Sequence, residues 1–139
     1  MAGCVLRVSS LTDNVEALLD VSRLKACAIF RKGEPRIAGS SVTNCVSGFN
    51  VVVSNADGAA MDKQVRDAVR FLKRHKERLQ RLKRHKEFGG MSLDFGLWMP
   101  GEDVICRSYT CPATLIELAG KLKIEIEISL YSTDNDAAG

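Results

Sequence analysis

The sequence has no apolar run that approaches the ~20 residues of a membrane-spanning helix. Its N-terminal segment, MAGCVLRVSS, lacks a positively charged region followed by an apolar one, so we expect no secretory signal peptide. The five cysteines do not form the two closely spaced pairs that are typical of zinc sites. An odd number of cysteines without an export signal is typical of reduced thiols. We therefore expect a cytoplasmic protein with no membrane partner.

The sequence also lacks recognisable catalytic and metal-binding motifs. It contains no G-x-S-x-G, no H-E-x-x-H and no phosphate-binding glycine loop. The tripeptide Asp94-Phe95-Gly96 matches the magnesium-binding triplet of protein kinases, but the other kinase loops are missing and the chain is too short. His75 and His85 are too far apart in sequence to act as the i,i+4 zinc ligands of a helix. These absences favour a non-catalytic protein without a cofactor or a bound metal.

Positive charge is concentrated in one stretch, Arg70–Glu87. This stretch holds nine Lys and Arg and two Glu, a balance of +7, whereas the whole chain carries +3 and the remainder therefore −4. It forms the second half of a helix predicted over residues 60–87 from the spacing of apolar residues. The candidate binding residues of this basic helix are Arg70, Lys73, Arg74, Arg78, Arg81, Lys83 and Arg84.

Two functions are compatible with the basic helix. Clustered Lys and Arg neutralise phosphates, which suggests nucleic-acid binding. No aromatic residue is interleaved between Lys73 and Glu87 to stack on bases, however. A solvated or partner-contacting helix face is therefore our first interpretation, and nucleic-acid binding is the alternative.

The hexapeptide LKRHKE occurs twice in this helix, at Leu72–Glu77 and Leu82–Glu87. On a straight helix with ~3.6 residues per turn, residues ten positions apart differ in direction by about 80°. We therefore predict that equivalent residues of the two copies point to different faces.

The order of predicted elements is β-α-β-β-α-β, followed by a further helix and strand. The first six elements match the split βαβ pattern of ferredoxin-like proteins. The segments 91–99 and 124–131 alternate apolar and polar residues, which is typical of a sheet with one covered and one open face. We predict a single α+β domain over residues 1–131. It has a mainly antiparallel sheet, helices on one face, a ferredoxin-like core and a C-terminal αβ extension. Residues 132–139 are predicted to form a disordered tail.

The polar sides of the two alternating segments define a candidate site on the open face. Its residues are Asp94, Trp98, Glu125, Glu127 and Tyr131. Carboxylates beside aromatic residues suit protein recognition. The main prediction is therefore a protein-interaction module that binds another protein, or itself as a homodimer. An enzyme that uses the open-face carboxylates for acid–base chemistry is a further alternative.

Three segments carry a resemblance to known proteins: FRKGEP at Phe30–Pro35, GFNVVVS at Gly48–Ser54, and LIELAGKLKIEIEISLY at Leu115–Tyr131. They resemble a family of small, uncharacterised bacterial domains, the domain of unknown function numbered 4279. The resemblance spans most of the chain and implies a bacterial protein. It brings no assigned catalytic residues, and it suggests an immunity-like role, the neutralisation of a toxin, as one option.

Overall fold

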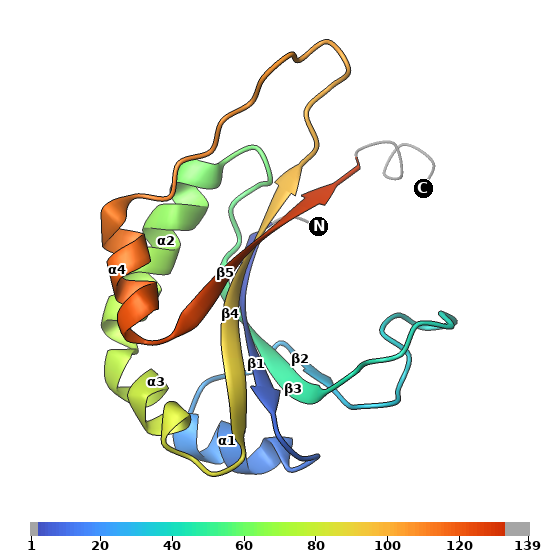
Figure 1. Ribbon diagram of the computed structural model, residues 1–139, viewed down its shortest axis with the longest axis vertical. Coiled ribbons are helices and arrows are strands. Elements are labelled where there is room, and N and C mark those ends of the chain that lie inside the picture. Colours follow the sequence, from blue (N-terminus) through green and yellow to red (C-terminus); the bar gives the residue numbers. More distant parts are fainter. Residues whose placement is uncertain (1–2, 133–139) are drawn as a thin grey trace.

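The central strand of the sheet is β1 (Gly3–Ser10), which pairs with a neighbour on each side. It lies antiparallel to β3 (Ser47–Ser54) and antiparallel to β4 (Phe88–Trp98). Along β1, half-buried and buried residues alternate, because one face of the sheet is covered and the other is open. Figure 1 shows this arrangement in a computed structural model that describes residues 3–132.

Two outer strands complete a five-stranded sheet with the order β2-β3-β1-β4-β5. The short strand β2 (Ala28–Phe30) is antiparallel to β3, whereas β5 (Ile124–Tyr131) is parallel to β4. The sheet is therefore mixed rather than purely antiparallel. The parallel pair arises because α4 (Ala113–Lys121) connects β4 to β5, and such a crossover returns the chain in its original direction.

The predicted α+β class is confirmed, and the ferredoxin-like core stays a prediction. That prediction rests on the β-α-β-β-α-β order of the first six elements; in the structure, the first four strands have the antiparallel order β2-β3-β1-β4. The domain limits likewise stay a prediction, and residues 133–139 of the expected tail lie outside the described residues. No helix within residues 3–132 is long and apolar enough to cross a membrane.

The helices within residues 3–132 all lie on one side of the sheet (Figure 1). Besides α4 they are α1 (Val15–Ser22), α2 (Met61–Arg74) and α3 (Lys76–Lys83). Apolar side chains from the helices meet those from β1, β3 and β4 in one core. Its largest fully buried members include Leu6, Leu18, Phe49, Leu72, Leu79, Leu82, Leu93 and Phe95. We call α2 and α3 together the helical layer.

The long helix predicted over residues 60–87 is divided at His75 and ends at Lys83. His75 has φ −107° and ψ 15°, outside the α-helical region, so α3 begins in a new direction. Leu72 and Leu82, the equivalent leucines of the two hexapeptides, are both fully buried. Burial of both leucines is compatible with directions about 80° apart, because the covered face of an amphipathic helix is at least this wide, so the prediction that equivalent residues point to different faces stays a prediction.

Residues after α3 turn directly into β4, which begins at Phe88 rather than at residue 91 as predicted. Gly89 and Gly90, which lie between the predicted helix and the predicted strand, belong to this strand. A Cβ atom on Gly89 would lie 2.9 Å from the carbonyl oxygen of Ser9. The glycine therefore permits close approach of β4 to β1.

Candidate interaction site on the open sheet face

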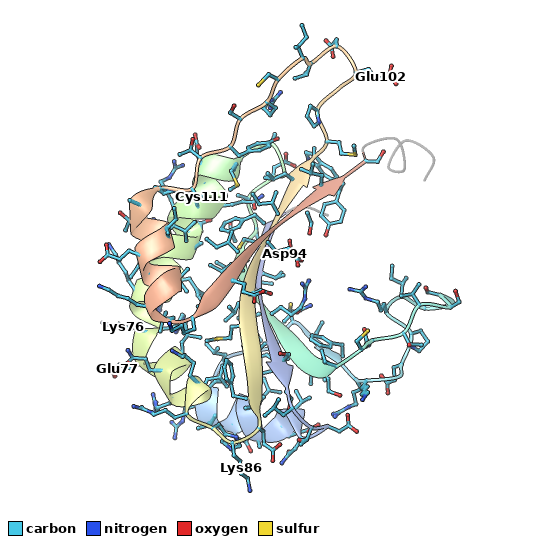
Figure 2. All side chains as sticks on the ribbon, in the orientation of Figure 1. Lys76, Glu77, Lys86, Asp94, Glu102 and Cys111 are labelled. Atoms are coloured by element: carbon cyan, nitrogen blue, oxygen red, sulfur yellow. The ribbon has the colours of Figure 1, made fainter. Side chains whose placement is uncertain are left out.

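The five residues predicted for the open face lie on neighbouring strands. Asp94 and Trp98 are on β4, and Glu125, Glu127 and Tyr131 are on β5. The parallel register places Asp94 opposite Glu127 and Trp98 opposite Tyr131. Directly opposed residues point to the same face of a sheet, so these pairs are close neighbours. Figure 2 shows Asp94 near the middle of the sheet.

A residue that the sequence analysis missed, Arg7 on β1, joins these carboxylates. Its guanidinium donates hydrogen bonds to Asp94 Oδ2 at 3.2 Å and to Glu127 Oε1 at 3.1 Å. The hydroxyl of Ser129 donates to Asp94 Oδ1 at 2.7 Å. We call Arg7, Asp94, Glu127 and Ser129 the Arg7 cluster. It links strands β1, β4 and β5 on the open face.

The members of the cluster differ in burial. The Asp94 side chain is 8% exposed, and those of Arg7 and Glu127 are 34% and 51% exposed. Burial acts to lower the pKa of Arg7, but the hydrogen bonds with Glu127 and Asp94 outweigh it, so this pKa lies above its ordinary value. The cluster is thus a charge-assisted network with one nearly enclosed carboxylate.

This network limits what the carboxylates can do chemically. A general base needs an accessible oxygen within reach of a substrate proton. Both oxygens of Asp94 already accept hydrogen bonds, and Glu127 is bound to the same guanidinium. Glu125 is exposed and lies outside the cluster. The structure therefore does not assemble these three carboxylates into one reactive group.

The two aromatic residues of the site are held in different ways. Trp98 is half-buried, and its indole Nε1 donates to Asp57 Oδ1 at 3.1 Å, which fixes the ring to the segment before α2. Tyr131 is 42% exposed, and its ring lies over Gly96, where a Cβ atom would approach within 3.1 Å of it. Glycine at this strand position therefore leaves room for the tyrosine.

Two hollows lie on either side of Arg7. One, of about 440 Å³, extends toward the segment that connects β2 to β3; its lining includes Arg7, Phe30, Pro35, Arg36, Asn44 and Asn50. This connecting segment projects away from the helices (Figure 1). The other hollow, of about 460 Å³, is lined by residues that include Arg7, Ser9, Phe88, Ser92, Lys123 and Glu125. The open face is therefore not flat, because a hollow lies on each side of Arg7.

The predicted basic residues belong to the opposite side of the molecule. Five of them are exposed on the helical layer or just after it, and Arg78 and Lys83 are half-buried. Arg70 Nη1 lies 3.6 Å from Asp67 Oδ1, and Arg78 Nη1 donates a hydrogen bond to the carbonyl oxygen of Arg23 at 3.5 Å. Figure 2 shows Lys76 on the helical side and Lys86 at the lower end of the molecule, both away from Asp94. The basic residues and the Arg7 cluster therefore do not form one site.

A family model described as a domain of unknown function, DUF4279, matches residues 2–133. The chain belongs to this family. The match confirms the resemblance seen in the three sequence segments. A search of curated proteins and a search of solved structures each found no match.

Proposed function

We propose that this DUF4279 domain is a non-catalytic protein-interaction module that binds its partner with the open sheet face. The observation that carries the proposal is the Arg7 cluster, which holds charges in fixed positions between two hollows. Groups that are already ordered lose little conformational entropy on binding. An immunity-like role, with a toxin as the partner, would be one case of this interaction.

The surroundings of the cluster indicate the chemistry of the partner. Glu125 and Glu127 present carboxylate oxygens to solvent, and Tyr131 and Trp98 add aromatic surface beside them. Aromatic residues contribute much of the free energy of protein–protein binding, and nearby carboxylates select basic partners. A partner that presents Lys or Arg beside an apolar side chain would complement this face.

The experiment is affinity capture from a nuclease-treated bacterial lysate with three forms of the full chain. The open-face variant, Trp98→Ala with Glu125→Lys, removes an aromatic side chain and reverses an exposed charge beside the cluster without removing a member of it. The matched control, Arg74→Glu with Arg81→Glu, changes two exposed residues of the helical layer. We expect the native chain and the control to retain the same protein and the open-face variant to lose it. Retention by the open-face variant would refute the proposal.

Nucleic-acid binding by the helical layer is the second candidate. Lys73, Arg74, Arg81 and Arg84 are exposed and make no ion pair within the described part of the chain. Phosphate contacts of this kind weaken steeply as salt is added. The test is binding of duplex and single-stranded DNA and RNA across a salt series. Loss of binding in Arg74→Glu/Arg81→Glu, but not in Trp98→Ala/Glu125→Lys, would favour this function. Absence of binding at low salt would remove it.

A further inference from the structure

The two edges of the sheet are very different. β2 spans three residues, a length too short to offer an extended pairing surface. β5 spans eight residues, keeps a continuous register with β4, and contains no proline, lysine or arginine. Proteins usually protect a long edge strand with such residues or with a bulge, because its unpaired backbone groups attract other strands. No strand of the described chain pairs with the outer side of β5.

One hydrogen bond establishes which backbone groups of β5 point outward. The carbonyl oxygen of Tyr131 accepts from the backbone nitrogen of Met99 at 2.8 Å, so the backbone of Tyr131 faces β4. Successive residues of a strand direct their backbone groups to opposite sides. The outward groups therefore belong to the even-numbered residues, Ile126, Ile128 and Leu130.

The side chains of these same residues become more exposed along the strand. Ile124 is 6% exposed, whereas Ile128 and Leu130 are 44% and 50% exposed. Their partners on β4, Phe95 and Leu97, are fully buried. The C-terminal half of β5 therefore combines backbone groups that point away from β4 with exposed aliphatic side chains.

We propose that β5 pairs antiparallel with β5 of a second copy of this chain, around a two-fold axis at Ile128. Identical strands related by such an axis are antiparallel, and the residue at the axis faces itself. An axis at Ile126 would oppose Glu125 with Glu127 twice, and an axis at Glu127 would oppose that carboxylate with itself. Like charges directly opposite are destabilising. The axis at Ile128 instead opposes Glu127 with Ser129 and Glu125 with Tyr131.

This register also joins the exposed aliphatic side chains. Ile128 meets Ile128 of the second copy, and Ile126 meets Leu130. An axis at Ser129 would avoid like charges too, but it pairs a shorter part of β5. The two Glu127 side chains come diagonally near each other across the axis at Ile128, and each is bound to Arg7 of its own chain. The self-association joins the backbone edges of two β5 strands and brings open-face residues such as Glu125 and Tyr131 together across the axis, but it does not depend on the binding of another protein.

The test is the oligomeric state of the full chain, measured by sedimentation over a range of protein concentrations. Ile128→Lys places two ammonium groups at the axis and is expected to yield monomers. The matched control is Ile29→Lys, because Ile29 is a similarly exposed isoleucine, at 48%, on the other edge strand. The control is expected to remain dimeric. A native chain that is monomeric at every concentration, or dissociation by Ile29→Lys alone, would overturn the proposal.

A second pair of variants tests the register. Tyr131→Glu opposes Glu125 with a second carboxylate and should weaken self-association roughly tenfold. Adding Glu125→Lys to the same chain replaces this repulsion by two attractive pairs and should restore dimers. Far-ultraviolet circular dichroism confirms that each variant is folded. Failure of the double variant to recover would refute the axis at Ile128.

Discussion

The helical layer and the open sheet face both carry many charges, but they hold them differently. In the helical layer, Leu72, Leu79 and Leu82 are fully buried, while most of the basic residues extend into solvent. On the open face, Arg7 is bound to two carboxylates from two other strands. Salt screens the solvent-exposed charges of the helical layer, and substitution of these residues should change the free energy of unfolding little. The paired charges around Arg7 instead hold three strands in a fixed relative position. The Arg7 cluster therefore ties the charges of the open face into the fold, whereas most of the basic residues of the helical layer are not held in this way.

The largest effect is expected from the leucines that attach the helical layer. Leu72→Ala and Leu82→Ala should each lower the free energy of unfolding by about 2 to 5 kcal/mol, because each leaves a cavity in the core. Urea denaturation measures this change. Ile116→Ala serves as the control. Because Ile116 is 55% exposed, its truncation should lower the free energy of unfolding much less. A small effect of Leu82→Ala would mean that the second hexapeptide does not pack as described.

The next largest effect is expected within the Arg7 cluster. Arg7→Gln leaves the nearly enclosed carboxylate of Asp94 without its cation and should cost about 2 to 3 kcal/mol. Glu127→Gln should cost less than about 1 kcal/mol, because Glu127 is half exposed. A double-mutant cycle with Asp94→Asn isolates the Arg7–Asp94 coupling. If Asp94→Asn and Glu127→Gln lowered the free energy of unfolding equally, burial would not distinguish the Arg7–Asp94 pair from the Arg7–Glu127 pair.

The sequence predicted the open face because β4 and β5 alternate apolar and polar residues with a period of two. It did not reveal Arg7. The predicted order of elements begins with a strand, but nothing local indicated that this strand lies at the centre of the sheet, beside β4. A single arginine among apolar strand residues was the available signal. Its meaning depends on which strands become neighbours, and that is determined by the tertiary fold.

The sequence likewise did not predict that the basic helix is divided at His75. LKRHKE contains neither glycine nor proline, the residues that usually mark the end or the bending of a helix. Burial of both Leu72 and Leu82 accompanies the change of direction between α2 and α3. The parallel pairing of β5 was similarly not predicted. A crossover through a helix gives parallel strands when they are neighbours, but the sequence does not show that β5 lies next to β4.

Acidification should affect stability through the helical layer. Burial lowers the pKa of His75, and the charges of Arg78 and Arg74 lower it further. The folded chain therefore binds fewer protons at this site than the unfolded chain, whose histidine titrates near 6.5. The free energy of unfolding should fall as the pH drops below about 6.5.

Thermal unfolding of the native chain and of His75→Gln, measured between pH 7.5 and pH 5 in buffers of about equal ionic strength, tests this contribution. His75→Gln should lose less stability over this range than the native chain. His85→Gln is the control and should retain the contribution of His75. Identical pH profiles for the native chain and His75→Gln would contradict the assignment.

The smallest effect is expected from the exposed basic residues. Arg74→Glu with Arg81→Glu should change the free energy of unfolding by no more than about 0.5 kcal/mol, because neither arginine makes an ion pair in the described part of the chain. The native chain should be slightly stabilised by added salt, which screens repulsion among the Lys and Arg side chains of the helical layer, and the variant should respond less. Chemical denaturation at low and high salt measures both quantities. A loss as large as that of Arg7→Gln would mean that charges on the helical layer are tied into the fold as firmly as those on the sheet. The distinction between the two surfaces would then fail.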